Sequence, residues 1–197
     1  MDGLLIDWGG VLTTSLIAAF DAFSAREGLG EHAVREAFKH QPDARQALID
    51  LESGEISLPE FEQRLGAALN VDPDGLARRL TADLRPDPAM RDAVRRYRDA
   101  GIRTALVSNS WRRDDYADLD AFDVTVLSQE VGVRKPDERI YRIALDRLGL
   151  PAERCVFVDD LGGNLKPAKA LGMTTIRHEI PANTVSQLDR LLLARSS

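Results

Sequence analysis

Polar side chains of the types that catalysis uses follow each of the main apolar stretches in the sequence. If these stretches are parallel strands of one sheet, their carboxyl ends meet at one edge, which is where such sheets bind ligands. An acid, a hydroxyl, an amine and two further acids are then expected to converge there. In chain order the residues concerned are Asp7, Ser108, Asn109, Lys135, Asp159 and Asp160.

Asp7, followed by Trp8, Gly9 and Gly10, has the surroundings expected of a carboxylate nucleophile. A carboxylate can attack a phosphoryl group when a cation neutralises both partners. The two glycines leave backbone amides and a carbonyl bare, so that the loop can approach a phosphate and provide a metal ligand. From these residues alone, a helix-capping aspartate beside a glycine turn is the alternative.

Asp159 and Asp160 are adjacent acids at the end of an apolar stretch. Two carboxylates that close a buried strand repel each other, and keeping both ionised is costly without a cation. Hard oxygen ligands in small number favour Mg²⁺. Asn164, at the start of the following helix, is expected to orient these acids from behind. The alternative is that one acid caps the helix and the other is solvated.

Ser108, Asn109 and Lys135 are candidates for binding an anion at the same edge. The Ser108 hydroxyl and the amides of the following turn can donate hydrogen bonds to phosphate oxygens. Lys135 can add a fixed positive charge. Taken singly, the first two residues are also typical of a helix N-cap, and a lone lysine is typical of solvated surface.

The elements that must position these residues alternate along the chain between apolar runs and helical patterns. Continuous apolar runs are typical of buried parallel strands, and helices between them imply a doubly wound α/β sheet of about five strands. Helix starts are expected at Ser57, with Glu60 completing a capping box, at Asp87, and at Thr184 with Gln187. The strands are expected at 3–6, 102–107, 124–127, 155–158 and 173–176.

Residues 15–85 interrupt this alternation with helical spacing only, and they predict an insertion of three or four helices. We therefore expect an α/β hydrolase core at 1–14 and 86–197, with a helical cap at 15–85 inserted after the first strand. Such a cap would act as a lid over the sheet edge and contact the substrate. Its candidate substrate-contacting residues are Arg35, Lys39, His40 and Arg45.

Composition excludes several classes of function. The 197 residues carry 26 basic and 32 acidic side chains, a formal charge of −6, which disfavours nucleic acid and anionic membranes as partners. No apolar run is long enough to span a bilayer. A single cysteine, Cys155, excludes a disulfide within the chain. The three histidines lack metal spacing and are expected at the surface or in loops. A cytoplasmic protein is expected, and the sequence predicts no oligomeric state.

Four of the segments above occur in the order of the motifs of the haloacid dehalogenase superfamily, and the chain resembles its small capped phosphatases. The segments are Asp7 in Leu5–Leu12, Ser108 in Leu106–Asn109, Lys135 before Pro136, and Asp159-Asp160 with Asn164. The flanking sequences, such as 127–141 and 54–57, are most similar to the branch that includes glucose-1-phosphate phosphatases. They are also similar to the N-terminal phosphatase domain of epoxide hydrolases.

The resemblance implies a Mg²⁺-dependent phosphatase that acts on a small phosphorylated metabolite, with a sugar phosphate as the expected substrate. Asp7 would attack phosphorus and form an aspartyl-phosphate. By the same resemblance, Asp7, Asp160 and the Gly9 carbonyl would hold the metal. Ser108, Asn109 and Lys135 would hold the phosphoryl oxygens, with Asp159 and Asn164 behind them.

Gly9 departs from the family pattern, which usually has a second aspartate two residues after the nucleophile. Losing a positioned acid/base costs about 10²–10⁴ in rate. One interpretation, which we favour, is that the substrate has an easy leaving group, as in an anomeric phosphate. A second is that a group of the cap or of the substrate replaces the acid. A third is that the protein is a non-catalytic binding module. A metal-independent 2-haloacid dehalogenase also lacks this aspartate, but it would leave Asp159 and Asp160 without a cation.

Overall fold

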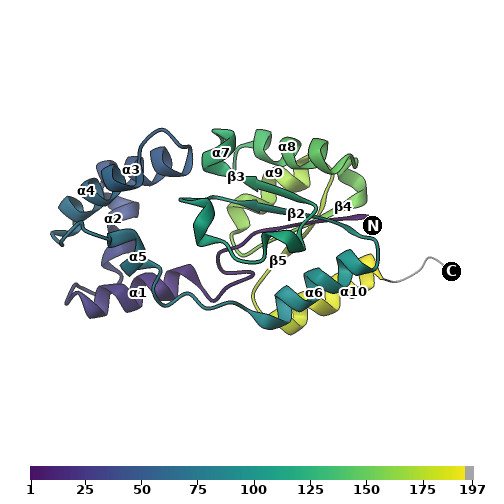
Figure 1. The fold of residues 1–197 in the computed structure, drawn as a ribbon, viewed down its shortest axis with the longest axis horizontal. Helices are drawn as coiled ribbons and strands as arrows, with labels where there is room; N and C mark the ends of the chain where they lie inside the picture. Colours follow the sequence, from purple (N-terminus) through teal and green to yellow (C-terminus); the bar gives the residue numbers. More distant parts are fainter. Residues whose placement is uncertain (194–197) are drawn as a thin grey trace.

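The computed structural model describes residues 1–193, so the last four residues of the expected core, 194–197, lie outside the described residues. Its centre is a sheet of five parallel strands in the order β3-β2-β1-β4-β5 (Figure 1). The predicted α/β fold is confirmed. The strands are β1 (Gly3–Ile6), β2 (Arg103–Ser108), β3 (Val124–Leu127), β4 (Cys155–Asp159) and β5 (Thr174–Arg177).

Both faces of the sheet are covered by helices, which explains why the strands are apolar throughout. Leu4 and Ile6 of β1 face a core shared with α6 (Pro88–Asp99) and α10 (Pro181–Leu192). Leu5 points the opposite way, into a core shared with α8 (Glu138–Leu148) and α9 (Gly162–Ala170). In Figure 1 the first pair of helices lies below the sheet and the second pair above it.

Residues 15–85, called here the helical insertion, form five helices where three or four were expected. These helices pack around an apolar core of their own that includes Phe23, Phe61 and Leu65, and in Figure 1 they lie to the left of the sheet. The chain enters and leaves the insertion through two adjacent segments, because Thr14 N donates to Arg85 O at 2.8 Å. The helices are α1 (Leu16–Arg26), α2 (Ala33–His40), α3 (Pro42–Glu52), α4 (Leu58–Leu69) and α5 (Leu76–Leu80).

The helix starts expected at Ser57 and Asp87 are confirmed, and the one expected at Thr184 is wrong. Ser57 caps α4 by accepting from Glu60 N at 3.3 Å, but the Glu60 carboxylate pairs with Arg64, so the reciprocal half of the capping box is absent. The terminal helix α10 begins at Pro181 and not at Thr184. Thr184 lies inside that helix, and its hydroxyl is 3.0 Å from His178 Nδ1.

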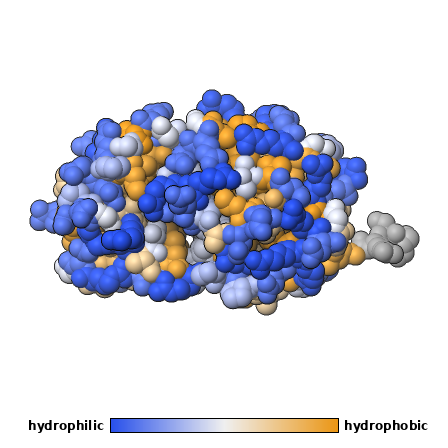
Figure 2. Space-filling view, viewed as in Figure 1, coloured by the Kyte–Doolittle hydropathy of each residue, from blue (hydrophilic) through white to orange (hydrophobic). Residues whose placement is uncertain are grey.

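The remaining elements are short. They are α7 (Ser128–Val131) and three 3₁₀ turns at Arg113–Asp115, Leu119–Ala121 and Ala152–Arg154. Within residues 1–193, no helix has the length and apolar character needed to cross a membrane. The face in Figure 2 is largely hydrophilic and is hollowed where the helical insertion meets the sheet and the helices that cover it.

Candidate active site

The carboxyl edge of the sheet brings the predicted polar residues together. Asp7 directly follows β1, while Ser108 and Asp159 are the last residues of the flanking strands β2 and β4. Because β1 lies between these strands, its aspartate is placed between the hydroxyl on one side and the acids on the other. Lys135 reaches this edge from the segment after α7.

Lys135 is a buried cation held between two acids. Its Nζ lies 2.7 Å from Asp7 Oδ1 and 2.8 Å from Asp159 Oδ2, and its side chain is 1% exposed. Burial disfavours the ammonium form, but the two carboxylates outweigh it and raise the pKa of Lys135. The lysine therefore stays charged, and its ammonium group lies directly against the expected nucleophile.

The side chain of Asn109 fixes the backbone of this lysine. Asn109 Nδ2 donates to Lys135 O at 3.1 Å, and Lys135 N donates to Asn109 Oδ1 at 2.8 Å. Both functional atoms of the Asn109 amide are thus used to position the lysine. Its binding of phosphoryl oxygens stays a prediction.

Asp159 is fully buried and held from three sides. Besides the lysine, Leu161 N donates to its Oδ1 at 2.8 Å, and Asn164 Nδ2 lies 3.0 Å from both carboxylate oxygens. Asn164 is the third residue of α9, so the turn after β4 returns it towards the strand end. The structure therefore places Asn164 against the Asp159 carboxylate, and its role in orienting metal ligands stays a prediction.

Asp7, Asp159 and Asp160 form the acidic cluster of the site, with one carboxylate oxygen from each within 4.8 Å of the others. Burial raises the pKa of Asp7 to about 7, although Lys135 lowers it in part. Burial and the Asp159 charge also raise the pKa of Asp160. Keeping these carboxylates ionised is therefore costly unless more positive charge is nearby. Three carboxylates offer hard oxygen ligands, which is the kind of site that fits Mg²⁺.

The glycine loop after Asp7 lies closely against this cluster. Gly10 has a φ of +77°, and a Cβ there would be 2.6 Å from Asp160 Oδ2, so only glycine fits without displacing the acid. By contrast, a Cβ on Gly9 would meet nothing within 4 Å. The missing aspartate at position 9 is therefore not explained by lack of space.

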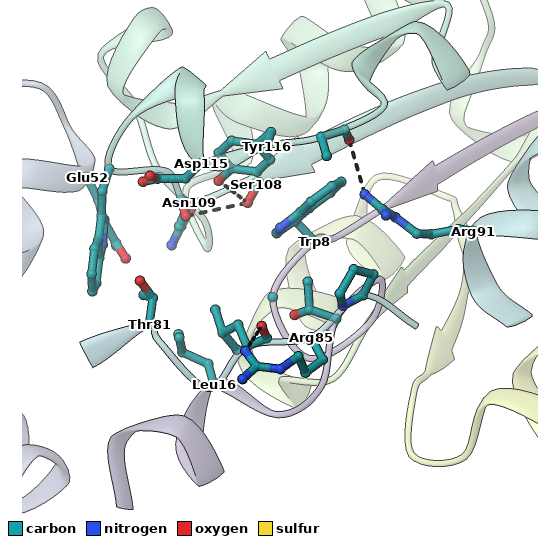
Figure 3. Close-up of a pocket in the computed structure, with 16 residues that line it drawn as sticks. Trp8, Leu16, Glu52, Thr81, Arg85, Arg91, Ser108, Asn109, Asp115 and Tyr116 are labelled. Carbon is teal, nitrogen blue, oxygen red and sulfur yellow. Dashed lines mark hydrogen bonds between the residues drawn. The ribbon is translucent and has the colours of Figure 1, made fainter. Parts of the chain in front are cut away.

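A cavity of about 310 Å³ lies between the sheet edge and the helical insertion. Trp8, Ser108 and Asn109 line it from the sheet edge, and Tyr116 lines it from the segment after β2 (Figure 3). Trp111, from the same segment, is a further lining residue. The substrate-contacting residues expected in the insertion, Arg35, Lys39, His40 and Arg45, are not among its lining residues. The insertion contributes instead Leu16, Glu52, Thr81, Leu84 and Arg85.

Two polar residues of this cavity were not anticipated from the sequence. The Tyr116 hydroxyl lies 2.9 Å from Ser108 Oγ, its ring packs on Trp8 at 5.0 Å, and burial raises its pKa. Glu52, at the end of α3, accepts from Arg134 Nε at 2.6 Å, and burial raises its pKa even though Arg134 opposes this. Neither residue has a sequence spacing that signals its position, because each meets its partner through the tertiary fold.

Comparison with known proteins places the chain in a family. A haloacid dehalogenase-like hydrolase model matches residues 1–172. Acyl-CoA dehydrogenase family member 10 of Mus musculus is 31% identical over 96% of this chain, although the chain spans only 19% of that protein. The phosphorylated carbohydrates phosphatase of Thermotoga maritima is 26% identical, over 89% of this chain and 84% of its own length.

A solved structure shows the same fold. A haloacid dehalogenase family enzyme of Bacteroides thetaiotaomicron, crystallised with magnesium and inorganic phosphate, superposes with a TM-score of 0.68 at 23% identity. The match covers 91% of this chain and 94% of that one. Since the family model spans most of the chain, from the first strand through the acid pair, the protein belongs to the haloacid dehalogenase-like hydrolases.

Proposed function

We propose that the protein is a Mg²⁺-dependent phosphomonoester hydrolase that acts on a small phosphorylated metabolite, a sugar phosphate, through an aspartyl-phosphate on Asp7. The observation that carries the proposal is the contact of 2.7 Å between Lys135 Nζ and Asp7 Oδ1 beside the other two acids. A carboxylate held this way keeps a free oxygen for attack, while the ammonium offsets the charge of an arriving phosphate.

Each residue of the site has a specific task in this proposal. Asp7, Asp160 and the Gly9 carbonyl would hold Mg²⁺, which supplies charge neutralisation for the attack when bound. Ser108, supported by the Tyr116 hydroxyl at 2.9 Å, donates to a phosphoryl oxygen. Lys135 holds another phosphoryl oxygen, and Asn109 keeps that lysine in place.

The helical insertion is proposed as a cap of residues 15–85 over a core of residues 1–14 and 86–197. The cavity lies between the two, with lining residues from both. A substrate bound there would be shielded from water on the leaving-group side, which strengthens the charge interactions at the sheet edge.

The choice of substrate class rests on a relative and on the cavity. The Thermotoga maritima relative is a phosphatase of phosphorylated carbohydrates. Trp8, Trp111 and Tyr116 give the cavity aromatic walls, which suit the apolar faces of a sugar ring, and Thr81 and Arg85 add polar groups. The Bacteroides thetaiotaomicron enzyme was crystallised with magnesium and inorganic phosphate, which agrees with the ion proposed here.

Hydrolysis of an aryl phosphate tests this function directly. The wild-type protein should release phosphate with Mg²⁺ and not with a chelator, and Asp7→Asn should lose activity by several orders of magnitude. Aryl phosphates have good leaving groups, so the glycine at position 9 does not mask the result. Inactivity of the wild-type protein under every condition, or an unaffected Asp7→Asn variant, would reject the proposal.

A further inference from the structure

The proposed reaction contains two proton transfers, and the glycine loop supplies no group for either of them. A leaving oxygen must gain a proton, and the water that later hydrolyses the aspartyl-phosphate must lose one. An easy leaving group relieves the first requirement only. Gly9 lines the cavity with open space around it, so the acid/base must come from another part of the wall.

Two carboxylic acids line the cavity within residues 1–193, and they differ in their surroundings. Asp115 is bound at 2.6 Å by Arg112, three residues away on the same turn, and its side chain is 38% exposed. Glu52 is 10% exposed and lies on the cavity wall across from Trp8 (Figure 3). Of the two, Glu52 is therefore the one sheltered from bulk water.

Glu52 also lies on the side of the cavity that the chemistry requires. Asp7 attacks from the sheet edge, so the leaving oxygen departs in the opposite direction, towards the helical insertion. Glu52 is the last residue of α3 within that insertion. Its Oε2 is held at 2.6 Å by Arg134, the neighbour of Lys135 in the chain, so one segment positions both side chains.

We propose that Glu52 is the acid/base of the reaction, in place of the aspartate missing at position 9. The inference rests on the proposed function. In the first step an Asp7 oxygen bonds to phosphorus, the bond to the leaving oxygen breaks, and the Glu52 carboxyl gives its proton to that oxygen. In the second step the Glu52 carboxylate takes a proton from water as the water oxygen bonds to phosphorus. The bond to Asp7 breaks, and inorganic phosphate leaves.

The electrostatic surroundings of Glu52 agree with a group that gives up and regains a proton. Burial raises its pKa above the ordinary value, while the facing cations Arg134 and Lys135 oppose the shift. Burial is the main cause that raises the pKa of the Tyr116 hydroxyl, and the charges of Asp7, Asp115 and Glu52 add to it, so that hydroxyl stays protonated.

Glu52→Gln separates proton transfer from position, because glutamine keeps an oxygen that can accept from Arg134 but has no acidic proton to transfer. We would measure kcat/KM on a hexose 6-phosphate, a hexose 1-phosphate and 4-nitrophenyl phosphate, whose leaving groups need progressively less protonation. The expected loss is about 10²–10⁴ on the 6-phosphate, smaller on the 1-phosphate and under about 10-fold on the aryl ester. With the aryl ester, slow hydrolysis of the aspartyl-phosphate should produce a burst of nitrophenolate.

Asp50→Asn is the matched control, because Asp50 is also a buried acid of α3 paired with an arginine, Arg64 at 3.3 Å, but does not line the cavity. It should show no dependence on the leaving group. If Glu52→Gln loses kcat/KM equally on all three esters, or loses none, Glu52 is not the acid/base. The proposed function would still stand. If Asp7→Asn keeps wild-type activity on the aryl ester, the proposed function itself falls, and this inference with it.

Discussion

Replacing Lys135 by methionine should destabilise the protein more than any surface change, because two buried acids would lose their shared cation. Lys135 Nζ contacts Asp7 and Asp159 at 2.7 and 2.8 Å and is 1% exposed. Breaking a buried pair by removing one partner costs about 3–5 kcal/mol, since the remaining charge is uncompensated. For a chain of this size about 1 kcal/mol shifts Tm by about 2–4 °C, so Tm should fall by about 6–20 °C.

The loss should depend on pH in a defined direction. Lys135 lowers the pKa of Asp7, which burial raises to about 7, so removing the lysine raises it further. The carboxyl then takes a proton at neutral pH and relieves part of the cost. Lys135→Met should therefore be less destabilising at pH 6 than at pH 8 when Mg²⁺ is absent.

Thermal and urea unfolding in the presence of a chelator measure both effects. Lys166→Met is the control, because Lys166 is an exposed lysine of α9 with no ion pair within residues 1–193. Its effect should stay within about 0.5 kcal/mol. A Lys135→Met variant that is as stable as this control at pH 8 would refute the argument that the ammonium group holds the two acids together.

Two further predictions follow from the structure. Gly10→Ala should weaken Mg²⁺ binding more than 10-fold in a calorimetric titration, because the new Cβ would lie 2.6 Å from Asp160 Oδ2. The control is Gly28→Ala, which has a similar φ of +67° but open space around it and should leave Mg²⁺ binding unchanged. His178 bonds Thr184, and burial lowers the pKa of its imidazole. This imidazole therefore takes a proton near pH 6.5 in the unfolded chain but stays neutral at that pH in the folded protein. Stability should therefore fall as the pH drops below 6.5, and His178→Gln should flatten this decline in urea unfolding at pH 7.5 and 5.5. Unchanged Mg²⁺ binding in Gly10→Ala, or an equal decline in both proteins, would contradict these predictions.

The sheet and its polar edge could be predicted because their signals are local. A strand buried on both faces is apolar throughout, and the residue after it lies at the carboxyl edge. Asp7, Ser108 and Asp159 therefore follow from strand ends alone. The resemblance to the family added the roles, and the structure brings the residues together.

The cavity wall could not be predicted, because long-range contacts determine how the helical insertion lies against the sheet domain. Phe61 packs on Trp111 with ring centroids 5.3 Å apart, and Glu52 pairs with Arg134, 82 residues away. Helical periodicity identifies which face of a helix is buried, but not the side chain at its end that faces a distant loop. The basic residues of α2 and early α3 were chosen for their charge, and they do not line the cavity.

His178 illustrates a second reason for error. It was expected at the surface or in a loop, and it lies in the loop after β5. Its side chain is nevertheless buried, at 7% exposed, and Thr184, expected to cap the last helix, bonds the imidazole. A short polar side chain can cap a helix or satisfy a buried partner, and the sequence alone does not say which bond forms.

The proposed function requires that Asp7 carry the phosphoryl group during turnover. Its most direct test is to quench the wild-type protein in acid during steady-state hydrolysis of an aryl phosphate with Mg²⁺, and to map the modified peptide by mass spectrometry. We expect one phosphoryl group on Asp7, absent without Mg²⁺ and absent in Asp7→Asn. A phosphoryl group on another residue, or full turnover by Asp7→Asn, would contradict it.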